Sequence, residues 1–323
     1  MAVFTPVTEK EVEALLAGYA LGRLVRLEAI GQGIENSNYF VTTDLDGREA
    51  RWVLTLFETL KKEELPFFME YMTVLASQGL PVPAPVPDLN SQTIQLLASR
   101  PAVLFPCLTG HEIKEPGVLQ CQQVGIMVAR LHQVKHVGHL TRPPVRTVRW
   151  MYSNYHKLCQ QSSFGDQALL ERVIDYIETR QGGWKQCRVG LVHGDLFRDN
   201  LLFSGDRITG LIDFYHACED YLLFDLAVAA NEWCFDMVRG EYDQARITSL
   251  VQSYQSIAGW PESSQACWPD FLLLAATRFW ISRLVSWHLP GYQGNAVQGN
   301  IAKSPDEYRL KVEAILAAFD LGC

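Results

Sequence analysis

The sequence lacks long hydrophobic runs, patterned cysteines and an early apolar leader. Its longer apolar stretches, such as residues 272–276, fall far short of the about 18 residues that a membrane-spanning helix needs. The eight cysteines form no Cys-x-x-Cys pair and have no zinc-finger spacing. Four charged residues within positions 9–13 argue against a secretory signal. These absences predict a cytoplasmic protein with reduced thiols and no membrane partner.

The sequence also lacks an excess of positive charge. It has 28 Lys and Arg against 36 Asp and Glu, a formal net charge of −8. This diffuse acidic balance argues against a nucleic-acid partner, which would need a basic face to displace counterions. Hydrophobic residues make up 48% and charged residues 20%, which is typical of a packed globular chain. A length of 323 residues predicts two domains at ~150 residues each.

The first third of the chain has the pattern of a β-rich lobe. Thr8 and Glu11 have capping-box spacing at the start of a short helix, and Asp46-Gly47 has the signature of a hairpin turn. Gly79 and the prolines after it end a longer helix. We expect a domain over residues 1–107. Its predicted strands are 24–30, 39–43, 52–57, 93–97 and 102–105, and its long helix is 61–78.

The rest of the chain, residues 108–323, is predicted to be a mainly helical domain. Helical periodicity predominates from residue 116 onward, interrupted in the middle by short apolar segments that fit strands. The fold class is therefore α+β, with a β lobe followed by a larger helical lobe. The predicted helices are 116–135, 147–160, 166–180, 221–238, 241–257, 265–287 and 305–319, and the predicted strands are 188–192, 201–203 and 208–212.

Three polar residues follow the ends of short strands in the second domain. Asp195 and Asn200 lie in a polar loop between two apolar segments, and Asp213 ends the next apolar segment. Phosphoryl transfer needs a carboxylate that accepts a hydroxyl proton and hard oxygen ligands for Mg²⁺. The spacing matches the catalytic loop and metal aspartate of protein-kinase-like phosphotransferases. The alternative is that all three merely form turns. We expect His193 to be structural and Asp225 to brace the loop.

Residues 193–195 are His-Gly-Asp. In this motif the chain resembles the small-molecule branch of these enzymes, which includes the aminoglycoside phosphotransferases and the choline kinases. Over roughly residues 24–290 the chain resembles the homoserine kinases of that branch. The segments that carry the resemblance are GIENSNYF (33–40), WVLTLFE (52–58), LPFF (65–68), GLPVPAP (79–85), DLFRDN (195–200), DFYHAC (213–218), YLLFDLA (221–227), NEWC (231–234) and TRFW (277–280).

The resemblance implies a two-lobed protein-kinase-like fold that transfers phosphate from ATP to the hydroxyl of L-homoserine. The product would be O-phospho-L-homoserine, the precursor of threonine. It implies that Asp195 is the catalytic base and that Asn200 and Asp213 hold Mg²⁺. The residues expected to bind the nucleotide are Gly31, Gly33, Asn36, Ser37 and Asn38 over the phosphates, Thr55 on the third strand, and Phe105, Cys107 and Leu108 at the link between the lobes.

One position departs from the general kinase pattern. The third strand usually carries a lysine that grips the phosphates, and here Thr55 stands in its place. A hydroxyl supplies no charge, so Arg51, Lys61 or Lys62 are candidates for that role, and Glu70 is left without the usual lysine. This departure leaves open a second function, that of a catalytically silent nucleotide-binding regulator.

Recognition of homoserine requires a carboxylate for its ammonium and an arginine for its carboxylate. Arg198 and Arg278 are the first choices for the carboxylate and Asp220 for the ammonium, with Trp233 and Trp280 as walls. Arg278 alternatively forms a structural salt bridge, and the tryptophans alternatively pack in the core. Other amino alcohols (choline, ethanolamine or an aminoglycoside) are the alternative substrates. Further candidates are Glu219, Glu232 and Asp236 for the ammonium and Arg283 for the carboxylate.

Overall fold

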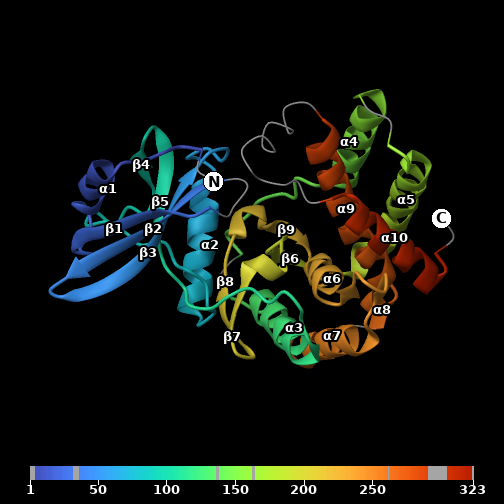
Figure 1. The fold of residues 1–323 in the computed structure, drawn as a ribbon. Helices are drawn as coiled ribbons and strands as arrows, with labels where there is room; N and C mark the ends of the chain where they lie inside the picture. Colours follow the sequence, from blue (N-terminus) through green and yellow to red (C-terminus); the bar gives the residue numbers. More distant parts are fainter. Residues whose placement is uncertain are drawn as a thin grey trace. The chain divides into compact units, whose positions relative to one another are not determined.

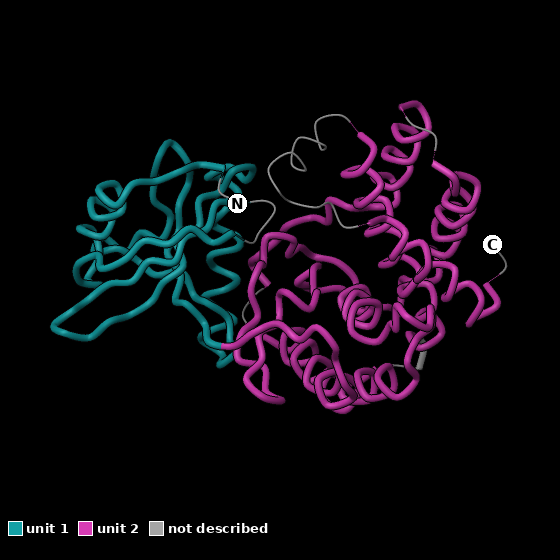
Figure 2. Tube along the Cα trace, in the orientation of Figure 1, with its two compact units in different colours: residues 1–109, 297–300 teal, residues 110–296, 301–323 magenta. Residues whose placement is uncertain are grey.

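The computed structural model describes residues 4–31, 36–135, 138–161, 164–260, 262–289 and 304–321. The chain forms two compact units: the first runs to Thr109 and the second begins at Gly110 (Figure 2). The sequence places this boundary after residue 107. No helix among these residues is long and apolar enough to cross a membrane.

The first unit is an antiparallel five-stranded sheet with two helices (Figure 1). The strand order is β1-β2-β3-β5-β4, and the three first strands follow one another as hairpins. Thr8 and Glu11 form the expected capping box at the first helix. The elements are α1 (Glu9–Leu16), β1 (Arg23–Ala29), β2 (Asn36–Leu45), β3 (Arg48–Phe57), α2 (Leu65–Ser77), β4 (Gln95–Leu97) and β5 (Arg100–Pro106).

The core of this sheet follows from alternation along its strands. Tyr39 and Val41 of β2 and Leu54 and Leu56 of β3 are buried together with Val12 of α1. Helix α2 begins at Leu65, whereas the sequence predicts a start at residue 61. The reason is Pro66, which fits the first turn of a helix because it has no amide hydrogen to donate.

The second unit is mainly helical and carries three two-stranded sheets. Its elements are α3 (Val118–His132), α4 (Val148–Gln161), α5 (Gln167–Arg180), η1 (Gln181–Gln186), β6 (Val189–Val192), η2 (Arg198–Asn200), β7 (Leu201–Ser204), β8 (Arg207–Leu211), η3 (Phe214–His216), β9 (Cys218–Tyr221), α6 (Leu222–Trp233), β10 (Phe235–Asp236), β11 (Glu241–Tyr242), α7 (Gln244–Ala258), α8 (Glu262–Gln265), α9 (Trp268–His288) and α10 (Asp306–Phe319).

Close helix packing forms the framework of this unit. Helix α9 is buried along most of its length and packs against α4, α6 and α10. Helices α3 and α7 lie side by side (Figure 1). Gly125 allows this close approach, because a Cβ at that position would lie 2.2 Å from the main-chain oxygen of Leu250.

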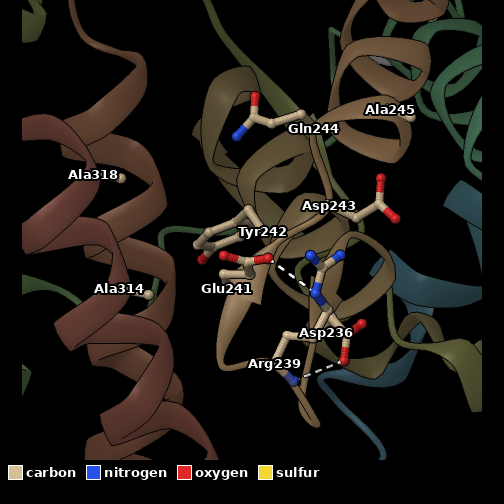
Figure 3. Close-up of a pocket in the computed structure, with 9 residues that line it drawn as sticks. All are labelled: Asp236, Arg239, Glu241, Tyr242, Asp243, Gln244, Ala245, Ala314 and Ala318. Carbon is tan, nitrogen blue, oxygen red and sulfur yellow. Dashed lines mark hydrogen bonds and ion pairs between the residues drawn. The ribbon is translucent and has the colours of Figure 1, made fainter.

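The sequence predicts one helix over residues 221–238 and another over residues 241–257. The prediction is wrong where the first helix ends and the second begins. Residues 235–236 and 241–242 instead pair as the hairpin β10–β11. Asp236 Oδ1 accepts hydrogen bonds from the amides of Val238 and Arg239, and this turn diverts the chain from the helix. Arg239 Nε lies 3.1 Å from Glu241 Oε1 across the hairpin (Figure 3). The short strand β9, which pairs with β6, also has no counterpart in the prediction.

Candidate active site

The catalytic loop predicted from the sequence runs from the end of β6 to η2. Asn200 donates both hydrogens of its amide to Asp195, one to the main-chain oxygen at 2.8 Å and one to Oδ2 at 2.9 Å. The amide of Phe197 also donates to the main-chain oxygen of Asp195, at 2.8 Å. Asn200 is buried and Asp195 is half-buried. The loop therefore fixes the Asp195 carboxylate by local hydrogen bonds.

The loop that carries Asp213 is joined to the catalytic loop by main-chain hydrogen bonds. The amide of Ile212 donates to the main-chain oxygen of Asn200 at 3.0 Å. Asp213 is the residue after Ile212, so it begins next to this hydrogen bond. Asp213 has a left-handed backbone, with φ 65° and ψ 62°, and is exposed. A non-glycine residue in this region is uncommon and is typical of functional loops. The structure thus joins Asp195 to Asn200 directly and links the residue before Asp213 to Asn200.

His193 connects the two loops and is fully buried. Its Nδ1 accepts a hydrogen bond from the amide of Asp195 at 3.2 Å, which requires the proton of the neutral ring to be on Nε2. Nε2 then donates to the main-chain oxygen of Ile212 at 3.0 Å. Burial lowers the pKa of His193, against the opposing charges of Asp225 and Asp195. Both ring nitrogens are engaged, so His193 holds the loops in place, as expected.

Asp225 of α6 braces the same loop. Its two carboxylate oxygens accept hydrogen bonds from the amides of His193 and Gly194, both at 2.8 Å. His132 of α3, for which the sequence gives no signal, lies 3.2 Å from Asp225 Oδ2 and 3.0 Å from the hydroxyl of Tyr254. Burial opposes the charge of Asp225, but these histidines and hydrogen bonds hold its pKa below the usual value.

Asp195 has electrostatics suited to a general base. Burial raises its pKa, while the charges of His216, His193 and Arg146 oppose that rise. A carboxylate with a raised pKa is a stronger base, and this favours acceptance of a proton in the reaction. No role is assigned from the sequence to Arg146 or to His216, although His216 lies in the segment DFYHAC (213–218).

The donor set of Asn200 and Asp213 fits a magnesium ion. Because both amide hydrogens of Asn200 point to Asp195, its remaining polar atom is the carbonyl oxygen Oδ1. Asp213 adds an exposed carboxylate. Mg²⁺ is usually held by one or two such oxygen ligands together with water and substrate phosphates. In the described part of the chain no three His, Cys, Asp or Glu side chains cluster as a metal cage.

The residues predicted to bind the nucleotide lie in the first unit. Gly31 follows β1, whereas Gly33 lies outside the described residues. Ser37 is fully buried: its Oγ accepts from the amides of Phe4 and Thr5 and donates to Glu58 Oε1 at 2.6 Å. The Ser37 hydroxyl therefore anchors the N-terminal segment to the sheet. Asn36 and Asn38 lie on β2, Phe105 is buried on β5, and Cys107 and Leu108 are half-buried after β5.

Thr55 is buried in the sheet in the place of the usual lysine. It lies opposite Asn38 in the β2–β3 ladder, and its Oγ1 donates to Asn38 Oδ1 at 2.8 Å. Arg51, a candidate to replace the lysine, lies over the ring of Phe40 at 3.7 Å and pairs with Glu28 at 3.7 Å. Both side chains therefore have partners within this unit.

Two of the residues first chosen for substrate binding are paired with each other. Arg278 Nη1 lies 2.6 Å from Asp220 Oδ2, both side chains are buried, and the guanidinium lies 4.2 Å from the ring centre of Phe224. This is the structural salt bridge that was the alternative for Arg278. Trp233 is also in the core, with no exposed surface, and donates from Nε1 to the main-chain oxygen of Leu196. Trp233 therefore supports the catalytic loop and does not line an open pocket.

Arg198 and two of the further candidates, Glu232 and Arg283, line an open cavity. Arg198 begins η2, three residues after Asp195, and its Nε lies 3.3 Å from Glu232 Oε1. Its Nη1 donates to the main-chain oxygen of Lys114 at 2.7 Å. The cavity has a volume of about 480 Å³. Its lining residues are Arg198, Glu232, Met237, Arg283, Ser304, Asp306, Glu307 and Leu310.

A second hollow, of about 490 Å³, lies between the β10–β11 hairpin and α10 (Figure 3). It is lined by polar residues of the hairpin and by Ala314 and Ala318 of the helix. Of the predicted site residues, only the reserve candidate Asp236 lines it. The cavity beside Arg198 is therefore the one related to the catalytic loop.

Comparison with known proteins identifies the family of the chain. Residues 26–260 match the model of the phosphotransferase enzyme family. The homoserine kinase of Janthinobacterium sp. (strain Marseille) is 36% identical over 292 residues, which cover 90% of this chain and 89% of that protein. The homoserine kinase of Neisseria meningitidis serogroup B is 36% identical over 309 residues, covering 96% and 98%.

Solved structures confirm the predicted two-lobed kinase-like fold. A microcompartment-associated aminopropanol kinase matches with a TM-score of 0.70 and 19% identity, covering 96% of this chain and 98% of that chain. An amicoumacin kinase in complex with AMP-PNP, Ca²⁺ and Ami matches with a TM-score of 0.69 and 17% identity, covering 96% and 93%. The chain therefore belongs to the phosphotransferase enzyme family and, within it, groups with the homoserine kinases.

Proposed function

We propose that this chain is an ATP-dependent kinase that phosphorylates the side-chain hydroxyl of L-homoserine. The observation that carries the chemistry is the joined pair of loops, in which Asn200 holds the Asp195 carboxylate and the Ile212 amide ties Asp213 to Asn200. The identity of about 36% with homoserine kinases over 90% or more of the chain supports homoserine as the acceptor.

In this mechanism Asp195 orients the acceptor hydroxyl and takes its proton as the oxygen attacks the terminal phosphate of ATP. Asn200 and His193 fix the position of Asp195 through its carboxylate and its amide. The raised pKa of Asp195, caused by burial, makes proton acceptance at neutral pH more favourable. Phosphoryl transfer depends mainly on such positioning and on charge stabilisation.

We assign Asn200 Oδ1 and the Asp213 carboxylate as the ligands of Mg²⁺. The ion would neutralise charge on the phosphates of ATP. In the first unit we assign the nucleotide to Gly31 and the start of β2, with residues 32–35 between them outside the described part of the chain, and to the main chain of residues 105–108. Thr55 then has a structural role through Asn38, which leaves the phosphates to backbone amides and the metal.

A cytoplasmic location remains a prediction. The cysteines of the described residues support it, because Cys107, Cys121, Cys159, Cys187, Cys218, Cys234 and Cys267 are free thiols.

The test is ADP release from Mg·ATP with separate acceptors: L-homoserine, L-serine, L-threonine, choline, ethanolamine and one aminoglycoside. We expect strong release with L-homoserine and a phosphate monoester product by ³¹P NMR. Release with choline or ethanolamine instead would keep the catalytic assignment and replace the substrate. ATP binding without release on any acceptor would support the silent regulator and refute the kinase.

A further inference from the structure

The cavity beside the catalytic loop lies against three helices of the second unit. Glu232 comes from α6, Arg283 from α9 and Glu307 from α10, and Arg198 comes from η2. Met237 and Leu310 add apolar surface. The cavity thus combines opposite charges with apolar walls, as sites for small polar molecules commonly do.

Five side chains at this cavity form a chain of alternating charge. Arg198 Nε lies 3.3 Å from Glu232 Oε1, and Lys311 Nζ lies 3.3 Å from Glu232 Oε2. Lys311 Nζ also lies 2.7 Å from Glu307 Oε1, and Arg283 Nη1 lies 2.5 Å from Glu307 Oε2. Each carboxylate is therefore shared by two cations.

The alternating chain has three cations and two carboxylates, and Asp306, which also lines the cavity, brings the carboxylates to three. Lys311 is almost fully buried, with 1% of its side chain exposed, and lies 4.2 Å from the ring centre of Tyr308. Arg283 is 9% exposed and Arg198 is 30% exposed, and these two line the cavity. Cations and carboxylates in equal number suit a zwitterionic ligand such as an amino acid, whose carboxylate an arginine can bind.

Aromatic contacts place this charge chain next to the reacting carboxylate. Arg283 lies 4.4 Å from the ring centre of Tyr308, which stacks on Phe197 at 6.4 Å and on Phe279 at 5.5 Å. Phe197 is two residues from Asp195 and donates its amide to the Asp195 main chain. Burial raises the pKa of Tyr308, and the charges of Glu232, Glu307 and Asp195 raise it further, so its hydroxyl lies in the field of all three.

We propose that this cavity binds the α-carboxylate of the acceptor amino acid between Arg198 and Arg283, with Lys311 positioning Glu232 and Glu307. The proposal rests on the proposed kinase function and identifies the feature by which the site selects an amino acid over a plain amino alcohol. The proposal takes Arg198 and Arg283 in place of Arg278, because both line this cavity and Arg278 is not among its lining residues. The proposal requires the acceptor hydroxyl to reach Asp195, which lies three residues before Arg198 in the same loop.

The experiment compares L-homoserine with 3-aminopropan-1-ol, which has the same hydroxyl and ammonium but no carboxylate. The measured quantity is kcat/KM for L-homoserine divided by kcat/KM for 3-aminopropan-1-ol. We expect this ratio to be about 10²-fold lower in Arg198→Met and in Arg283→Met than in wild type, mainly because KM for L-homoserine rises. Arg198→Lys should recover part of the ratio, because it restores the charge without the planar fork. Arg246→Met on α7 is the matched control, since Arg246 is 23% exposed and pairs with Asp243, and neither residue lines the cavity.

If Arg283→Met fails to fold, Arg283→Met/Glu307→Gln removes the same arginine without leaving a buried carboxylate short of a partner. An equal loss with both acceptors, or an unchanged ratio, would overturn the proposal. Binding of L-2-aminobutyrate and of 1-aminopropane, measured by calorimetry, separates this proposal from the kinase function, because it needs no turnover. If L-2-aminobutyrate binds more tightly than 1-aminopropane, and if Arg198→Met abolishes this difference, the carboxylate site is supported even in a protein without kinase activity. Equal binding of the two ligands to the wild-type protein refutes the site.

Discussion

Asn200 donates both hydrogens of its side-chain amide to Asp195. One goes to the main-chain oxygen and one to the carboxylate oxygen Oδ2, at 2.8 and 2.9 Å. This leaves Oδ1 as the only polar side-chain atom that Asn200 can offer to a cation. The orientation of the base and the orientation of a metal ligand are thus set by one side chain.

Replacement of the base tests the role of Asp195 directly. We expect Asp195→Asn to lower kcat by roughly 10² or more, the scale of a lost general base, while the Kd of Mg·ATP stays close to the wild-type value. The assay is ADP release together with calorimetric titration of Mg·ATP. Near-normal turnover in this variant would contradict the assignment.

The raised pKa of Asp195 also predicts a pH-dependent effect on stability. A carboxyl group whose pKa is higher in the folded than in the unfolded state makes folding less favourable as pH rises through that range. Asp195→Asn removes this cost and keeps the side-chain shape. We expect the variant to gain stability relative to wild type as pH rises above about 4, the usual pKa of an aspartate. Urea unfolding at several pH values measures the difference in unfolding free energy between Asp195→Asn and wild type. A difference that stays constant with pH would show that the pKa of Asp195 is not raised by burial in the folded state.

Removal of the exposed carboxylate tests the magnesium assignment. We expect Asp213→Ala to weaken binding of Mg·ATP by roughly tenfold or more, because one of two protein ligands is lost. Asp206→Ala is the matched control, since Asp206 accepts a hydrogen bond from Gln120 at the β7–β8 turn. Calorimetric titration with and without Mg²⁺ separates the metal from the nucleotide. Unchanged Mg·ATP affinity would exclude Asp213 as a ligand.

The catalytic loop could be predicted because its chemistry is local in the sequence. Asp195 and Asn200 lie within six residues, and Asp213 follows one hairpin later, so spacing alone brings them together. The strands of the first unit could be predicted for the same reason, since alternation and the Asp46-Gly47 turn are short-range signals.

The partners of the buried charges could not be predicted in this way. Asp220 and Arg278 are 58 positions apart, and His132 and Asp225 are 93 positions apart. Periodicity marks a residue as buried but does not say which charge faces it across the core. The hairpin β10–β11 escaped prediction for another reason: a side-chain turn at Asp236 overrides the helical periodicity around it.

The brace under the catalytic loop predicts a combined loss of stability and activity. Asp225→Ala leaves the amides of His193 and Gly194 without their acceptors in a fully buried place. We expect a loss of about 3 kcal/mol or more in unfolding free energy, with a large fall in kcat. Asp225→Asn keeps one acceptor oxygen and should lose less. Equal stability of Asp225→Ala and wild type in urea unfolding would rule out the bracing role.

The buried pair of Asp220 and Arg278 predicts a loss of stability without a loss of substrate affinity. Arg278→Met and Asp220→Asn should each cost about 3 kcal/mol, because each leaves a buried charge unpaired. The double variant should cost clearly less than the sum of the two, since no unpaired charge remains. We expect KM for L-homoserine in Arg278→Met to stay within about threefold of wild type, because a structural pair that does not touch the substrate changes binding little. A rise of about 100-fold in that KM would instead return Arg278 to the substrate site, since the loss of an arginine–carboxylate contact has that size.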